Sequence, residues 1–215
     1  MPSRVLPTLT HYWLRPLGAP AGTEGVLSQR ELTWAEGLPP ALGQRYRASR
    51  RLLRCWVAPL LALEPRELPL HSPPGQAPRL APGCGHLSLS HSGDRLLLAW
   101  SPQPIGVDLE WAQRPLPAAA ALARRFYPPQ EAARLLALPA AAQARALLES
   151  WVRKEAAIKW QGSALARDLR HWLWDGDVGE LRHLAEGWSP PSVCREIEGW
   201  LCGAVGEAAA GGIWG

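Results

Sequence analysis

Two acidic side chains stand two positions apart in the segment 105–110, which reads IGVDLE. On a β-strand successive side chains point to opposite faces, so Asp108 and Glu110 would point the same way. Neighbouring carboxylates repel each other unless a positive charge lies between them. Magnesium suits this position because it takes oxygen ligands, commonly one or two carboxylates together with substrate phosphates. Taken alone, the pair is more often the solvated face of an edge strand.

A second charged group follows helical spacing in the segment 151–159, which reads WVRKEAAIK. On a helix, Trp151, Glu155 and Lys159 lie on one side. Glu155 would complete a three-carboxylate metal site, and Lys159 or Lys154 would neutralise phosphate oxygens. These are the only two lysines among 23 basic residues, which indicates sites that need a compact point charge. A surface ion pair worth a few tenths of a kcal/mol is the commoner explanation of the helix pair by itself.

A histidine stands among small residues in Ser90-His91-Ser92-Gly93. Hydroxyl residues and glycine favour a turn that leaves backbone and side-chain donors exposed. His91 in such a turn could donate a hydrogen bond to a phosphate. An ordinary loop histidine fits the segment equally well.

Composition indicates a globular protein with room for one large domain or two small ones. The chain has 215 residues, of which 47% are hydrophobic and 20% charged, and a net charge of +4. No segment is apolar enough to span a membrane, and the N-terminus lacks the apolar run of a signal peptide. We therefore expect a cytoplasmic protein that binds neither membrane nor nucleic acid. The absence of asparagine and the scarcity of lysine suggest a GC-rich bacterial genome.

The elements that must position these residues follow from periodicity and turn signals. Helices are predicted over 26–36, 38–63, 118–125, 129–138 and 140–161, the last of which ends at Gly162. Residues 64–85 are predicted to form an irregular loop and 90–94 a turn. Strands are predicted over 96–100 and 105–110, paired as an antiparallel hairpin, and over 172–174 and 194–205. The four cysteines, which form no Cys-x-x-Cys pair, are predicted to be free thiols.

The three charged segments, taken in order, resemble the 4'-phosphopantetheinyl transferases of the larger, surfactin-synthetase-activating type. That family carries a Ser-His-Ser turn, a Gly-x-Asp-x-Glu strand and a Trp-x-x-Lys-Glu-x-x-x-Lys helix. The matching segments here are 90–92, 106–110 and 151–159. Upstream, the segment 49–53 resembles the arginine-bearing helix of the family.

The resemblance implies an α+β fold of two similar halves related by a pseudo-twofold axis. The halves would span residues 1–103 and 104–215, with the active site in the cleft between them. Because one chain would supply both sides of the cleft, we expect a monomer.

The resemblance also implies a role for each candidate residue. Three carboxylates would hold Mg²⁺ against the pyrophosphate of coenzyme A, namely Asp108, Glu110 and Glu155. Four side chains would contact coenzyme A phosphates, namely Arg50, Ser90, His91 and Lys159. Lys154 matches the motif lysine and is assigned to the same coenzyme A site. Asp108, Glu155 and Lys159 would be catalytic, with Glu155 as the candidate base for the attacking hydroxyl.

The implied reaction moves 4'-phosphopantetheine from coenzyme A to a serine of an apo acyl or peptidyl carrier protein and releases adenosine 3',5'-bisphosphate. Two alternatives use the same residues: a metal-dependent phosphoester hydrolase, and a binding protein that has lost activity. The family often has Gly-Lys-Pro in the middle loop, where this chain has Gly75-Gln-Ala-Pro-Arg79. Arg79 is the candidate substitute. The carrier protein and its pathway stay open.

Overall fold

The computed structural model describes residues 6–18, 25–163 and 168–215 and has a mixed α+β architecture. The first sheet contains β1 (His11–Pro16), β4 (His86–Ser92), β5 (Arg95–Ser101) and β11 (Ile213–Trp214), in the order β11-β1-β5-β4. The second contains β6 (Gly106–Trp111), β9 (Ser192–Ile197) and β10 (Trp200–Val205), in the order β6-β10-β9. β11 runs parallel to β1, and the other neighbours within both sheets are antiparallel.

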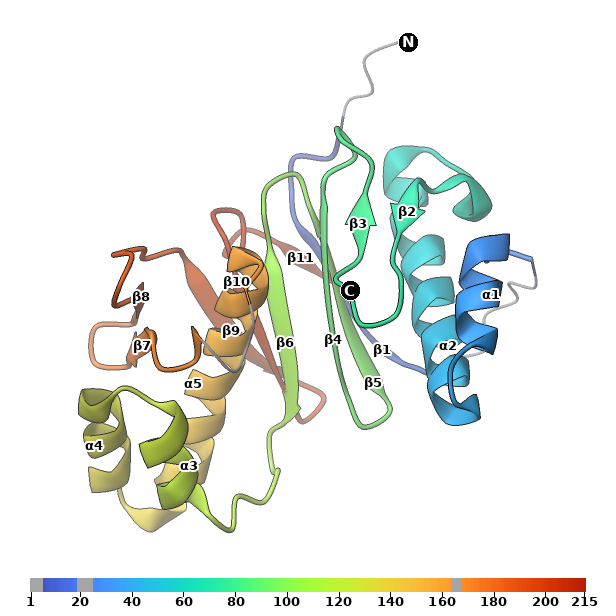
Figure 1. The fold of residues 1–215 in the computed structure, drawn as a ribbon. Helices are drawn as coiled ribbons and strands as arrows, with labels where there is room; N and C mark the ends of the chain where they lie inside the picture. The colour runs from blue at the N-terminus through green and yellow to red at the C-terminus, as the bar shows by residue number, and fades with distance from the viewer. Residues whose placement is uncertain (1–5, 19–24, 164–167) are drawn as a thin grey trace.

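The two sheets pack face to face, and a long helix covers the outer face of each (Figure 1). Alternation along β5 divides its side chains: Leu97 points into the core between the sheets, and Leu98 faces α2 (Pro40–Val57). On the other side, Val152 of α5 (Ala140–Gln161) packs on Leu201 of β10. The molecule is therefore a four-layer arrangement of helix, sheet, sheet and helix.

Smaller elements surround these layers. They include the helices α1 (Gln29–Glu36), α3 (Ala119–Phe126) and α4 (Pro129–Ala137). The 3₁₀ turns Pro59–Leu61 and Pro65–Glu67 lie between α2 and the strand that follows it. Two short hairpins pair β2 (Leu70–His71) with β3 (Arg79–Leu80), and β7 (Trp172–Asp175) with β8 (Glu180–His183). No described helix has the length and apolar character needed to cross a membrane.

Glycines let α5 approach the second sheet closely. A Cβ atom on Gly106 would lie 1.9 Å from the carbonyl oxygen of Ala156 and 2.5 Å from the backbone nitrogen of Trp160. A Cβ on Gly203 would lie 2.9 Å from the carbonyl oxygen of Val152. Both are glycines because the helix backbone occupies the space of a side chain. This approach sets the distance between the acidic strand β6 and the charged helix α5.

The helix predictions agree well with the structure, and α5 has the predicted bounds. It ends where Gly162 adopts a left-handed conformation, with φ of 74°, which glycine adopts without steric cost. The predicted strand 172–174 corresponds to β7. The predicted strand 194–205 is instead two antiparallel strands, β9 and β10, because the chain turns at residues 198 and 199. The C-terminal tail, which shows no strand signal, forms β11 on the edge of the first sheet. The four cysteines are free thiols.

The predicted hairpin of 96–100 with 105–110 is wrong. β5 pairs with β1 and β4, and β6 pairs with β10 in the other sheet. The predicted turn at 90–94 is too long, since Ser90, His91 and Ser92 lie within β4 and only Gly93 and Asp94 turn the chain. Serine recurs at every second position from Ser88 to Ser92, and the strand extends to Ser92. The link with Pro102 and Pro104 then carries the chain from one sheet to the other.

Candidate active site

Asp108 lies at the centre of the charged residues, on β6 where the two sheets meet. Its side chain is buried, and its Oδ1 accepts hydrogen bonds from Ser90 Oγ at 2.7 Å and Lys159 Nζ at 2.7 Å. Lys159 also donates to the carbonyl oxygen of Val107 at 3.0 Å. The other carboxylate oxygen, Oδ2, is buried without a hydrogen-bond partner. Buried oxygens of this kind are uncommon because the lost hydration is not replaced.

Glu155 faces this carboxylate from α5, one helical turn before Lys159. Burial, followed by the nearby negative charge of Asp108, raises the pKa of Glu155 from 4.5 to about 8. Two ionised carboxylates that share a site repel each other, and a proton or a cation between them relieves this repulsion. The space between the carboxyl groups of Asp108 and Glu155 can therefore hold either a proton or a cation.

Glu110 lies two residues further along β6. It accepts a hydrogen bond from Ser92 Oγ at 3.2 Å and forms an ion pair with Arg114. Burial raises the pKa of Glu110; the cation of Arg114 lowers it, and Asp108 raises it further. The predicted alternation on β6 thus puts Asp108 and Glu110 opposite the same neighbouring strand.

Serines of β4 join the two sheets along this line. The Val107 N–H donates to Ser88 Oγ at 2.9 Å, in register with the bonds from Ser90 to Asp108 and from Ser92 to Glu110. Sequence reasoning named Ser90 but missed Ser88 and Ser92. Their period of two was the available signal, because a strand puts alternate residues on one face.

Cationic side chains gather beside the carboxylates. His91 has its pKa lowered by burial and then by the positive charges of Arg45, Lys159 and Arg50. Arg50 is buried, lies over the ring of Tyr46 at 4.6 Å and donates to Ser49 Oγ at 3.0 Å. The Nε atoms of Arg45 and Arg50 are buried without hydrogen-bond partners. No sequence motif indicates that Arg45 lies beside these residues.

Two pockets border the charged residues. One is lined by His91 and Glu110 together with Arg45, which comes from α2. The other lies between the loop 75–79, β4 and the end of α5, and Lys159 and Arg79 both line it. The loop that lacks the expected lysine therefore lies next to the lysine of the helix.

The structure does not bring Lys154 to this site. Its side chain is fully buried, its Nζ lies 2.6 Å from Glu131 Oε2, and it lies 4.0 Å from the centre of the Tyr127 ring. Burial lowers the pKa of Lys154 to about 8, against the opposing effect of Glu131. Consecutive helical residues point about 100° apart, so Lys154 and Glu155 face different neighbours. The expected contact between Lys154 and coenzyme A does not fit this position.

The donor set suits a hard divalent cation. Asp108, Glu110 and Glu155 offer only oxygen, and the Oδ2 of Asp108 is buried without a hydrogen-bond partner. Lys159 and the two arginines can neutralise phosphate oxygens at the edge of the same site, and His91 can donate a hydrogen bond to them. Carboxylates beside several cationic donors are groups that an enzyme of phosphoryl transfer needs for positioning and charge neutralisation.

Comparison with known proteins agrees with this class. The sequence model of the 4'-phosphopantetheinyl transferase superfamily matches residues 104–198. A putative 4'-phosphopantetheinyl transferase of Synechocystis is 29% identical over 81% of this chain and 73% of its own length. The 4'-phosphopantetheinyl transferase HetI of Nostoc is 30% identical, over 73% and 70% respectively. The enzyme Sfp of Bacillus subtilis is 34% identical over 39% of this chain and 36% of its own.

The chain belongs to the 4'-phosphopantetheinyl transferase superfamily. It is an enzyme of this class, so the comparisons do not support the alternative of a phosphoester hydrolase. The similarity to the two cyanobacterial proteins extends over more of the chain than the similarity to Sfp.

Proposed function

We propose that the protein transfers 4'-phosphopantetheine from coenzyme A to a serine of an apo carrier protein, in the site formed by Asp108, Glu155 and Lys159. The observation that carries this proposal is that Asp108 accepts a hydrogen bond from Lys159 of α5 and that its charge raises the pKa of Glu155 on the same helix. The carboxylates and the lysine meet although about 50 residues separate them in sequence. The reaction itself is inferred from membership of the 4'-phosphopantetheinyl transferase superfamily.

The reaction forms one phosphorus–oxygen bond and breaks another. The serine hydroxyl oxygen of the carrier attacks the phosphorus on the pantetheine side of coenzyme A. The bond to the bridging oxygen of the pyrophosphate breaks, and adenosine 3',5'-bisphosphate leaves with the electron pair. We assign the hydroxyl proton to Glu155, directly or through water.

Asp108, Glu110 and Glu155 would hold Mg²⁺, and the partnerless Oδ2 of Asp108 supports this assignment. When bound, the ion offsets negative charge on the pyrophosphate and separates the repelling carboxylates. Ser90 donates to the other oxygen of Asp108 and fixes the orientation of the carboxylate.

Lys159 is proposed to exchange one partner for another. In the ligand-free protein its ammonium group neutralises Asp108. When Mg²⁺ is bound, it would neutralise Asp108 in place of the ammonium group of Lys159. Lys159 could then donate a hydrogen bond to an oxygen of the pyrophosphate. His91 and Arg50 are proposed to contact further phosphate oxygens from β4 and α2. Each of these groups stabilises the charge that develops on the leaving phosphate.

The pocket beside the loop 75–79 is proposed for the remaining part of coenzyme A. Arg79 and Lys159 both line it, so Arg79 is the candidate to replace the lysine expected in this loop. An arginine there can bind phosphate in a bidentate manner.

We further propose the two-half organisation, residues 1–103 and 104–215, related by a pseudo-twofold axis. A helix-covered antiparallel sheet in each part supports this division. The C-terminal strand β11 belongs to the second part in sequence but pairs with β1 in the sheet of the first part. We also propose that the protein is a monomer and that it acts in the bacterial cytoplasm.

The test incubates the protein with an apo carrier protein, coenzyme A and Mg²⁺, and follows the carrier by intact-protein mass spectrometry. The expected result is a gain of one phosphopantetheine group, absent with EDTA and absent with Asp108→Asn. His71→Ala, at an exposed position on β2, serves as the matched control and should transfer normally. No gain across acyl and peptidyl carriers, with release of phosphate from simple esters instead, would refute the proposal.

A further inference from the structure

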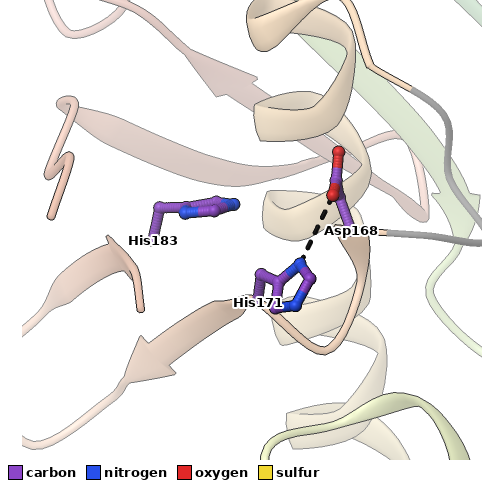
Figure 2. A group of neighbouring side chains, drawn as sticks. All are labelled: Asp168, His171 and His183. Atoms are coloured by element: carbon purple, nitrogen blue, oxygen red, sulfur yellow. Dashed lines mark hydrogen bonds and ion pairs between the residues drawn. The ribbon is translucent and has the colours of Figure 1, made fainter. Parts of the chain in front are cut away.

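A second group of metal-ligand side chains lies away from the carboxylates, around the β7–β8 hairpin. Asp168, His171 and His183 each place a ligand atom within 4.8 Å of the others. Asp168 lies in the connection after α5, His171 directly precedes β7, and His183 ends β8. Figure 2 shows the three side chains converging from these separate segments. The proposed transferase mechanism uses none of them.

His183 carries an unsatisfied polar atom that points into this group. Its side chain is buried, with 3% of the residue exposed, and its Nε2 has no hydrogen-bond partner. Its Nδ1 accepts the N–H of Glu186 at 3.0 Å. The rings of Trp172 and Trp188 pack against the imidazole, with centroids 4.9 Å and 5.5 Å away. The two tryptophan rings do not replace the hydrogen bond to water that His183 Nε2 loses on burial. An unsatisfied buried nitrogen of this kind indicates a binding site for a ligand.

The other two members complete the set. Asp168 is buried, and its Oδ1 lies 3.4 Å from Nδ1 of His171. The side chain of His171 is about half exposed, which gives an ion and a water molecule access from solvent. The group therefore combines two buried ligands with one at the surface.

We propose that Asp168, His171 and His183 bind a divalent transition-metal ion, with Zn²⁺ as the best match and water as the fourth ligand. Two imidazoles and one carboxylate suit Zn²⁺, which takes four nitrogen, oxygen or sulfur ligands. Mg²⁺ and Ca²⁺ prefer oxygen. This site is thus chemically distinct from the three carboxylates of the cleft.

Binding requires one change of tautomer. In the metal-free protein the neutral His183 carries its proton on Nε2, because Nδ1 accepts a hydrogen bond. The ion takes the lone pair of Nε2, the proton moves to Nδ1, and the N–H of Glu186 turns to solvent. Glu186 lies in an exposed turn, so its backbone can hydrogen-bond to water after this change.

The ion would act on the structure behind α5. Leu169 and Trp172 lie next to the ligands in sequence and pack with Ile158 of α5 in one apolar cluster. A metal bond between Asp168 and the β7–β8 hairpin would hold this layer against the helix that carries Glu155. We therefore infer a structural role, in which the metal stabilises the α5 side of the site.

The experiment titrates chelator-treated protein with Zn²⁺ by calorimetry in excess Mg²⁺. One equivalent should bind, and His171→Ala should weaken that binding at least about tenfold. His71→Ala and Asp108→Asn should bind Zn²⁺ as the wild type does. His171 is the first choice for substitution because its half-exposed ring can be removed with the least disturbance of the fold. His183→Gln provides the second test, with circular dichroism to verify folding.

Nitrogen-15 NMR of the imidazoles gives a readout that is independent of transfer activity. Zn²⁺ should shift Nε2 of His183 and convert that ring to the Nδ1–H tautomer. Binding that survives both histidine substitutions, or that is lost with Asp108→Asn, would overturn the proposal. So would an unchanged His183 tautomer at saturating Zn²⁺. None of these outcomes depends on whether the protein transfers phosphopantetheine.

Discussion

Glu155→Gln removes one ionisable group from the carboxyl pair between β6 and α5. In the ligand-free protein, burial and the charge of Asp108 make the ionised form of Glu155 unfavourable. Glutamine has nearly the same shape and can donate a hydrogen bond to Asp108, but it carries no charge at any pH. The substitution should therefore stabilise the ligand-free fold while it removes a metal ligand and the proposed base.

The size of the effect follows from the pKa of Glu155 and depends on pH. The folded protein holds this proton with a pKa of about 8, against 4.5 for an unperturbed glutamate. Between these values the folded state binds more protons than the unfolded state, so the stability of the wild type falls as pH rises. Each pH unit costs about 1.4 kcal/mol. The variant should thus match the wild type at pH 4 and exceed it by about 3 kcal/mol at pH 7.

Urea unfolding in EDTA at pH 4, 7 and 9 measures this difference. The gap should widen up to about pH 8, where the pKa of folded Glu155 lies, and then stay constant. Excess Mg²⁺ should reduce this difference in the free energy of unfolding, because the ion binds and stabilises the wild type but not the variant. The same variant should show no phosphopantetheine transfer. A Glu155→Gln protein that is less stable than the wild type at pH 9 in EDTA would refute the conclusion that burial and repulsion from Asp108 destabilise the ionised Glu155.

Three further predictions concern the elements around this pair. Lys159→Met should slow transfer by about 100-fold or more in the carrier-loading assay, because it removes a donor to the leaving phosphate; a rate within a factor of two of wild type would contradict that role. Lys154→Met should cost about 3–5 kcal/mol in urea unfolding, because it leaves the buried carboxylate of Glu131 without its cation. Glu131→Gln in the same chain should recover much of the loss, and additive losses would argue against the ion pair. Gly106→Ala should force α5 away from β6 and abolish transfer, whereas Gly211→Ala, where a Cβ meets nothing within 4 Å, should behave as wild type.

Local sequence signals predicted the parts of the molecule whose structure depends on near neighbours. Helix α5 ends at Gly162 because glycine alone enters the left-handed region at low cost. Alternation on β6 put Asp108 and Glu110 on one side, and the four-residue spacing put Glu155 and Lys159 on one face of α5. These relations need only the geometry of a strand and a helix.

The pairing of the strands could not be read in the same way. The chain suggested that β5 and β6 form a hairpin, since a short proline-containing link joins them. In the structure they belong to different sheets, and β4 meets β6 through side-chain hydrogen bonds from Ser88, Ser90 and Ser92. A short link fixes the distance between two strands but does not decide which edges pair.

The sequence by itself determined which charged groups the protein has and how they are spaced within each element. Only the tertiary structure decided their partners. It put Lys159 against Asp108 and buried Lys154 against Glu131, although the two lysines are five residues apart. It also gathered Asp168, His171 and His183, which form no recognisable motif. The physical reason is that periodicity encodes the face on which a side chain lies, whereas packing between elements decides what that face meets.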